Sequence, residues 1–411
     1  MSVLDIARST GGVARTTGSQ IARTPRRVRS TGSHIALLST PRRRIAWSEG
    51  FYEPPADLTG FATGELIRAE PMHAYLVPGV RLRARAWRML NRSTGAAGEP
   101  TAVSGMLLVP ENVRRSGPLP LVGFGVGTHG IGDDAAPSRL ISTGRDWEAG
   151  VMALVLARGI AVAITDYQGL GTPGDHAYMV GRALGANVLD SMRAARELLP
   201  EELPKTGPAA IMGYSEGGVA AAWAAQLQPT YAPELPLVGV AAGAAAADME
   251  LAGPTLNGSF FSFFLAYGAI GYAAAYPELD LEPYLTPDGR NAIKALRHSN
   301  VLQAAMRGPR FAHVDQLTQP NVMELPEWRA RLAENRLGTI ASAAPVLLHH
   351  GRHDQIVSFE HSEQLLKDWL ALGVDASLHV TRGGFDHVSG AVAGAPVALE
   401  WLSVKLRHSA V

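Results

Sequence analysis

A serine in a glycine-framed turn offers the clearest chemistry in this sequence. Ser215 stands in Gly213-Tyr214-Ser215-Glu216-Gly217, after a short apolar run and before an alanine-rich stretch. A strand, a sharp turn and a helix in this order expose a serine hydroxyl for nucleophilic attack, and larger side chains than glycine would collide across the turn. The backbone N–H of Glu216, at the start of the helix, would face a developing oxyanion. The motif predicts a serine nucleophile and one oxyanion donor.

A nucleophilic serine needs a base, and the base needs an acid to orient it. Asp354 follows a buried apolar run, and His387 follows the last such run of the chain. Both would lie in loops at the carboxyl ends of strands, in the order Ser, Asp, His. Asp386 is a rival acid, but it adjoins His387 in sequence and is poorly placed to reach its Nδ1. We therefore predict a triad of Ser215, His387 and Asp354.

The second oxyanion donor should come from the loop after an early strand. That loop is Gly125-Val126-Gly127-Thr128-His129-Gly130, and the small neighbours of Thr128 would let its N–H approach a substrate carbonyl. The same glycines fit a dinucleotide-binding fingerprint, which would make the protein an NAD-dependent oxidoreductase. That fingerprint leads directly into a helix and has an acid about 20 residues later. Here Pro137 makes a poor helix start and Asp166 comes too late, so the oxidoreductase is the less favoured class.

Alternating strand and helix patterns predict an α/β protein of the α/β-hydrolase fold, with a mostly parallel sheet covered by helices on both faces. The predicted strands are Met106–Val109, Leu119–Phe124, Ile160–Thr165, Pro208–Met212, Leu237–Ala242, Val346–His350 and Ala376–Thr381. The predicted helices are Val151–Ala157, Asn187–Leu199, Gly217–Gln226 and Ser358–Leu372. The core is expected in two parts, residues 46–250 and 341–411.

The alternation lapses over residues 251–340, which we predict to be an inserted helical lid or cap. Within it, Gly258–Tyr276 carries no charge and is long enough to be considered as a membrane span. A span here would separate two halves of one core, so an apolar lid over a lipid-binding cleft is favoured. Its phenylalanines are expected to line or cap a tunnel for the acyl chain, or else to form the packed core of the cap: Phe260, Phe261, Phe263 and Phe264.

The composition of the chain limits which partners and which cellular location are expected. The chain has 37 basic and 37 acidic residues, so nothing global indicates a nucleic-acid partner, and with no cysteine it has neither disulfides nor thiolate chemistry. Residues 1–45 carry nine arginines against one acid. They are expected to form a flexible tail or an arm that touches anionic membrane. Because no apolar signal core is evident, the sequence predicts a cytoplasmic or peripherally membrane-associated protein. Transient contact with a membrane or lipid interface is part of this expectation.

Three histidines near the last strands, His349, His350 and His353, raise the question of a metal site. Neighbouring residues of a strand face opposite sides of a sheet. Buried histidines with one hydrogen bond are therefore favoured over metal ligands, and no metal is expected.

With these segments in place, the chain resembles the secretory triacylglycerol lipases of the Candida lipase A type. The likeness rests on the elbow around Ser215 and on these further pieces: Gly127-Thr128-His129-Gly130, Ala136-Pro137-Ser138, Thr165-Asp166-Tyr167-Gln168-Gly169-Leu170-Gly171 and Val188-Leu189-Asp190-Ser191. It runs from Phe51 almost to the C-terminus.

The resemblance implies a helical lid between nucleophile and acid, no cofactor, and fatty acyl esters as substrates. It also assigns the triad to Ser215, Asp354 and His387, and the oxyanion N–H groups to Glu216 and Thr128. The chain departs from the family at Ala135, where members often have a cysteine, and in lacking an evident signal. A short-chain carboxylesterase or an acyltransferase on the same triad is the alternative.

Overall fold

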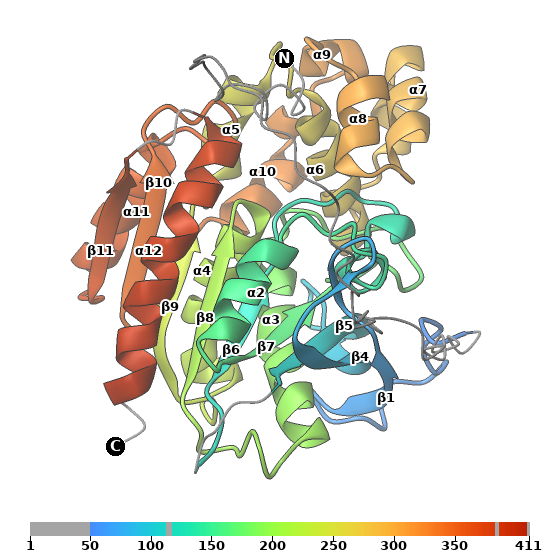
Figure 1. The fold of residues 1–411 in the computed structure, drawn as a ribbon. Coiled ribbons are helices and arrows are strands. Elements are labelled where there is room, and N and C mark those ends of the chain that lie inside the picture. Colours follow the sequence, from blue (N-terminus) through green and yellow to red (C-terminus); the bar gives the residue numbers. More distant parts are fainter. Residues whose placement is uncertain (1–49, 112–116, 383–385, 409–411) are drawn as a thin grey trace, which may run out of the picture. The chain divides into compact units, whose positions relative to one another are not determined.

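The computed structural model describes residues 50–111, 117–382 and 386–408 of the 411-residue chain. Figure 1 shows these residues as a ribbon coloured along the sequence. The predicted N-terminal tail, residues 1–45, lies outside the described residues.

Most strands belong to a single mixed sheet. Its members are β1 (Leu66–Met72), β4 (Ala84–Thr94), β5 (Pro100–Pro110), β6 (Leu121–Gly125), β7 (Ala161–Thr165), β8 (Ala209–Tyr214), β9 (Leu237–Gly243), β10 (Val346–Gly351) and β11 (Ala376–Thr381). Their order across the sheet is β1-β4-β5-β7-β6-β8-β9-β10-β11. Two short strands, β2 (Tyr75–Val77) and β3 (Val80–Arg81), pair separately.

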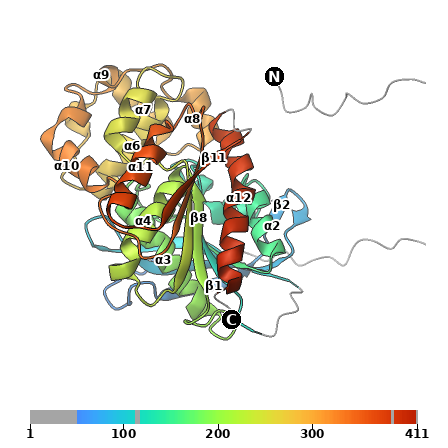
Figure 2. The same cartoon turned by 90° about the vertical axis from the view of Figure 1, so that its left-hand side faces the viewer.

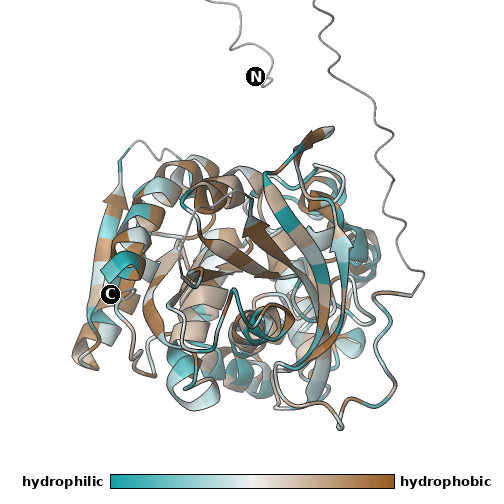
Figure 3. Cartoon of the chain, turned by 60° about the horizontal axis from the view of Figure 1, so that its bottom comes forward, coloured by the Kyte–Doolittle hydropathy of each residue, from teal (hydrophilic) through white to brown (hydrophobic). Residues whose placement is uncertain are grey.

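The sheet is parallel from β7 to β11 and antiparallel at the other edge, where β1, β4, β5 and β7 pair in turn. Every residue of the central strands β6, β7 and β8 is buried. That burial is typical of parallel strands covered on both faces, which consist of continuous apolar runs. The hydrophobic residues of Figure 3 accordingly follow these strands.

Helices cover both faces of the sheet. On one face lie α2 (Ala149–Ala157) and α12 (His387–His408), and on the other lie α3 (Gly181–Leu198), α4 (Glu216–Tyr231) and α11 (Glu360–Ala371) (Figures 1 and 2). The prediction of a mostly parallel sheet between two helical layers is confirmed. The elements that the sequence patterns did not predict include the strands β1 to β4 and the helix α12.

The chain between β9 and β10 is helical. It contains α5 (Met249–Leu256), α6 (Phe263–Ala275), η2 (Glu282–Tyr284), α7 (Pro287–Leu296), α8 (Val301–Arg307), α9 (Val314–Leu317), η3 (Val322–Glu324) and α10 (Pro326–Glu334). We call this insertion the cap; its exact limits, 251–340, stay a prediction. In the part of the chain that the structure describes, no helix is long and apolar enough to cross a membrane.

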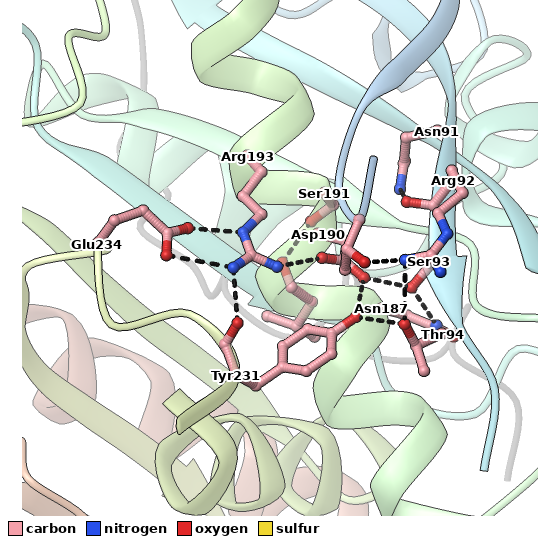
Figure 4. A network of polar contacts seen from close by, with 12 residues as sticks. Asn91, Arg92, Ser93, Thr94, Asn187, Asp190, Ser191, Arg193, Tyr231 and Glu234 are labelled. Carbon is pink, nitrogen blue, oxygen red and sulfur yellow. Dashed lines mark hydrogen bonds and ion pairs between the residues drawn. The ribbon is translucent and has the colours of Figure 1, made fainter. Parts of the chain in front are cut away.

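A buried ionic network ties α3 to the antiparallel edge of the sheet (Figure 4). The carboxylate of Asp190 is fully buried and accepts hydrogen bonds from Ser93 Oγ at 2.7 Å, Tyr231 Oη at 2.6 Å and Arg193 Nη1 at 2.9 Å. Arg193 also pairs with Glu234. Three donors satisfy one buried charge, so removing the carboxylate takes one acceptor from each of them at once and leaves Arg193 with Glu234 as its remaining acidic partner.

We expect Asp190→Ala to lower the free energy of unfolding by about 3 kcal/mol, because three hydrogen bonds to a buried charged group are lost together, at roughly 1 kcal/mol or more each. Urea denaturation followed by circular dichroism measures the change. The control is Asp375→Ala, at an exposed aspartate, which should leave the transition unchanged. Equal midpoints for the two variants would contradict a stabilising role for the network.

Candidate active site

Ser215 lies in a strained turn between β8 and α4. Its backbone has φ 60° and ψ −121°, in the left-handed region that non-glycine residues rarely adopt. A Cβ on Gly213 or Gly217 would overlap main-chain atoms of the turn or of Gly125. The Ser215 N–H donates to Gly243 O at 2.9 Å. The turn therefore holds the serine at the carboxyl end of the parallel strands, where the loops after β10 and β11 also lie.

The three predicted triad residues lie within hydrogen-bond distance of one another. His387 Nε2 is 2.9 Å from Ser215 Oγ, and His387 Nδ1 is 2.6 Å from Asp354 Oδ2. His387 is the first residue of α12, and its N–H donates to Gln355 Oε1 at 3.1 Å. This geometry can pass a proton from the serine to the imidazole while the carboxylate fixes the tautomer.

Asp354 is held by donors on both oxygens. Its Oδ1 accepts the N–H groups of Ile356 and Val357, each at 2.9 Å. Its Oδ2 accepts from His387 and also from His350 Nε2 at 3.1 Å. Burial raises the pKa of Asp354, but the hydrogen bonds from His350 and His387 outweigh burial and hold that pKa below its ordinary range. The carboxylate therefore stays ionised beside the imidazole.

For His350 the sequence predicted a buried histidine with one hydrogen bond, but not its contact with Asp354. It is fully buried on β10, and its Nδ1 contacts Ser362 Oγ at 2.8 Å. Because its Nε2 faces the Val357 carbonyl at 3.1 Å as well as Asp354, that nitrogen carries the proton. His350 thus orients the acid as a positioning residue, and the four-residue spacing to Asp354 was the available signal.

The rival acid Asp386 has a different role. Its Oδ1 accepts the Ser389 N–H at 2.8 Å and its own N–H donates to Ser389 Oγ at 3.0 Å, as in the cap of a helix. This arrangement begins α12 at His387. Asp386 therefore fixes the start of the helix that carries the imidazole.

Hydrogen bonds from a cluster of buried ionisable side chains hold the loop after β6 in place. The Gly127 N–H donates to Glu148 Oε2 at 2.8 Å. His129 Nδ1 donates to Gly127 O at 2.7 Å, and its Nε2 contacts Asp146 Oδ1 at 3.3 Å. Burial lowers the pKa of His129, but Asp146 and Glu148 raise it to about 9; burial raises that of Glu148 to about 8. The two acidic side chains therefore favour the protonated form of His129 under the loop.

The two predicted oxyanion donors have no acceptor within the part of the chain that the structure describes. Within the described residues, neither the Thr128 nor the Glu216 backbone N–H donates a hydrogen bond to a backbone or side-chain acceptor. The Thr128 hydroxyl contacts Tyr178 Oη at 3.0 Å. The buried side chain of Glu216 lies 2.7 Å from His176 Nε2, and His176 Nδ1 donates to Gln168 O at 3.0 Å. The long-range partners Glu148 and His176 gave no local signal in the sequence.

The same loop is joined to the cap. Gly130 and Asn300 form an isolated bridge, Val301 N–H donates to His129 O at 2.8 Å, and Ile131 N–H donates to Ser299 O at 3.0 Å. After this bridge the chain enters only a 3-10 helix, η1 (Asp133–Ala135), and the short α1 (Pro137–Ile141). A dinucleotide fingerprint would open a longer helix here.

The four predicted substrate-binding phenylalanines do not share one role. Phe263 is buried in the main core, Phe260 is 38% exposed, and Phe261 is half-buried. Phe264 stacks on Tyr178, with ring centroids 6.5 Å apart, and lines an apolar cavity of the cap. This cavity has a volume of about 700 Å³, its open part included, and lies among α6, α7, α9, η3 and α10. Of these four phenylalanines, Phe264 is the one that lines the cavity, and it contacts Tyr178, whose hydroxyl contacts Thr128.

The three histidines considered as metal ligands do not form a common site in the described residues. His349 is buried with a pKa lowered by burial to about 3, His350 is engaged with Asp354, and His353 is exposed. Across the described residues, no group of three or more histidine, aspartate or glutamate side chains could hold a metal ion.

Comparisons with known proteins agree with the fold. The sequence pattern of the family described as "Secretory lipase" matches residues 136–411. A probable inactive lipase of Mycobacterium tuberculosis is 26% identical over 96% of this chain and 88% of its own. Lipase 4 of Candida albicans is 27% identical over 86% of this chain and 80% of its own. Candida antarctica lipase A, solved in its closed state, superposes with a TM-score of 0.78 at 22% identity over 88% of this chain and 86% of its own.

These matches confirm the predicted α/β-hydrolase fold. They give the oxidoreductase alternative no support. The family description is "secretory", so the predicted cytoplasmic or peripheral location is not supported either.

The cluster under the loop makes stability depend on pH. The pKa of Glu148 is raised from 4.5 to about 8 and that of His129 from 6.5 to about 9. For each group, the folded protein binds more protons than the unfolded chain at any pH between the ordinary pKa and the raised pKa. The stability that the group contributes is therefore fully present below its ordinary pKa and is lost as pH rises through about 8 for Glu148 and about 9 for His129. We expect the urea midpoint to fall from pH 6 to pH 9.

Glu148→Gln should flatten this fall between pH 6 and pH 8, because glutamine cannot titrate yet still accepts the Gly127 N–H. The control Glu360→Gln changes an exposed glutamate and should keep the wild-type slope. An unchanged slope in Glu148→Gln would show that Glu148 is not the titrating group.

Proposed function

The chain belongs to the secretory lipase family, and from this we propose that it hydrolyses carboxylic esters of fatty acids through Ser215, His387 and Asp354. The observation that carries the proposal is the pair of hydrogen-bond distances that link the three residues, 2.9 Å and 2.6 Å. They stand at the carboxyl ends of the strands, next to two unengaged backbone N–H groups.

Ser215 Oγ attacks the ester carbonyl carbon while its proton moves to His387 Nε2. Asp354 stabilises the imidazolium that forms, and His350 holds Asp354 in place. His387 then returns the proton to the leaving alcohol, and the C–O bond to that alcohol breaks. Water repeats the sequence on the acyl-enzyme and releases the carboxylic acid.

The N–H groups of Glu216 and Thr128 stabilise the oxyanion of each tetrahedral intermediate. Glu148 fixes the peptide that precedes Thr128, and His176 pairs with the Glu216 side chain. Each donor is therefore supported by a buried ionisable residue, which keeps it aimed at the oxyanion before substrate binds.

We assign the acyl chain to the cap cavity. Its lining is almost wholly apolar, as burial of a hydrocarbon chain requires. Phe264 and Tyr178 stand between the cavity and Thr128. In this proposal Phe264 lines the acyl site and Phe263 packs the core behind it, whereas Phe260 and Phe261 are not among the residues that line the cavity.

The first experiment compares p-nitrophenyl esters from C2 to C16 with the wild type and Ser215→Ala. We expect the variant to lose about 10⁴-fold or more of the rate, as for other triad nucleophiles. Ser377→Ala, at an exposed serine of β11, is the control and should keep full activity.

The outcome is decisive because one relative is named a probable inactive lipase. A wild type that is inert on every ester, or a Ser215→Ala variant that keeps its rate, would overturn the proposal. A chain-length optimum at C2 to C4 would favour the short-chain esterase, and ester formation with added alcohol in place of hydrolysis would favour the acyltransferase.

Gly268 allows a direct test of the acyl site. It lines the cavity, and a Cβ added there meets no atom within 4 Å. Gly268→Leu should therefore fill the cavity without a clash and lower kcat/KM for C12 to C16 esters about tenfold relative to C4. Gly150→Leu, equally free of contacts on α2, is the control. Parallel losses at all chain lengths would contradict the assignment.

A further inference from the structure

One stretch of the cap is basic and free of acids. Between Asp288 and Asp315 the chain carries five cations and no aspartate or glutamate, although its overall formal charge is zero: Arg290, Lys294, Arg297, Arg307 and Arg310. Arg290 pairs with Glu282 and Arg297 with Asp175. Within the described residues Arg307 and Arg310 are exposed and form no ion pair. Arg307 and Arg310 therefore present positive charge without an ion-pair partner among the described residues.

The same stretch exposes large apolar side chains. Leu302 is 65% exposed and Met306 is 54% exposed, and their four-residue spacing puts them on one face of α8. Phe311 is 64% exposed, and its ring lies 5.9 Å from that of Phe260. Several exposed apolar residues beside cations are typical of a surface that enters a lipid interface.

The backbone holds Phe311 outward. Its φ is 59°, which is rare for a bulky residue, so the conformation is maintained by its surroundings. Its N–H donates to Ser259 O at 2.8 Å, and Ser262 Oγ donates to Pro309 O at 2.7 Å. A strained aromatic residue fixed in an exposed position is better explained by contact with something outside the chain than by packing.

This face adjoins the candidate active site. Helix α8 begins beside Asn300, which bridges Gly130 in the loop of Thr128. Val388 is 63% and Val392 is 71% exposed on the first turns of α12, directly after His387. Exposed apolar residues thus stand next to both the oxyanion loop and the base.

We propose that this face, defined by Leu302, Met306, Arg307, Arg310 and Phe311, docks on lipid surfaces that carry anionic headgroups. The arginines contact the headgroups while the apolar side chains enter the boundary of the acyl region. The docking follows from this surface alone; only its use, the delivery of ester substrate to Ser215, rests on the proposed function.

The test measures binding of the full-length chain, as Ser215→Ala to prevent hydrolysis, to phosphatidylcholine vesicles with and without 30% phosphatidylglycerol. We expect tighter binding to the anionic vesicles and a loss of about thirtyfold there for Arg307→Gln/Arg310→Gln. Phe311→Asn, which tolerates the left-handed backbone, should weaken binding to both kinds of vesicle. Urea midpoints of the variants verify that each is folded.

The matched control is Arg83→Gln/Lys205→Gln, which removes the same charge at two exposed sites outside the cap. It should bind anionic vesicles like the parent. A loss in the control equal to that in the cap variant would show that net charge, or the arginine-rich N-terminal residues, attract the vesicles, and would overturn the proposal. So would unchanged binding of the cap variant.

The two proposals fail separately. Hydrolysis of a soluble acetate ester by the chain with Ser215 intact tests the function without vesicles. A chain that is inert on that ester and on the whole p-nitrophenyl series, but binds anionic vesicles through Arg307 and Arg310, keeps the docking surface and loses the lipase assignment.

Discussion

At the carboxyl ends of β6 and β8, the backbones of Gly125, Gly213 and Gly217 lie so close that a Cβ on any of them would meet main-chain atoms of another. This approach sets the first turn of α4 against two strands and forces Ser215 to a φ of 60°. The strain is offset by burial of α4 against the sheet. As a result the serine hydroxyl, the Glu216 N–H and the loop of Thr128 converge before any substrate arrives.

Around this turn the protein buries ionisable groups that would be costly if they were unpaired. Each has a partner that also sets a geometry: His350 and His387 for Asp354, His176 for Glu216, and His129 with the Gly127 N–H for Asp146 and Glu148. The charges are therefore placed behind the reacting atoms rather than among them. Support of this kind is rigid, because movement of one partner exposes the other to an apolar interior.

The turn around Ser215 and the parallel strands could be predicted from the sequence because their signals are local. Each signal is an apolar run followed by a glycine-rich turn. The strand β4 was not predicted because Arg85, Arg88 and Arg92 interrupt its apolar pattern. Arg88 is nevertheless buried, against Phe51 and Glu70. The contacts of Glu148 and His176 could not be predicted for another reason. Glu148 binds Gly127, 21 positions away, and His176 binds Glu216, 40 positions away. In the cap, composition identified a phenylalanine-rich segment, but only helix geometry separates Phe263 in the core from Phe264 at the cavity.

The bridge between Gly130 and Asn300 makes the cap a continuation of the active-site loop. Because Val301 donates to His129 and Ile131 donates to Ser299, α8 cannot leave the loop without freeing buried backbone groups. Tyr267 adds a contact to Ser299 at 2.8 Å, from the helix that also carries Phe264. The proposed acyl cavity, the docking face and the oxyanion loop thus share one set of hydrogen bonds. Because α8 and the loop of Thr128 share these hydrogen bonds, the position of the helix and the position of the loop are set together.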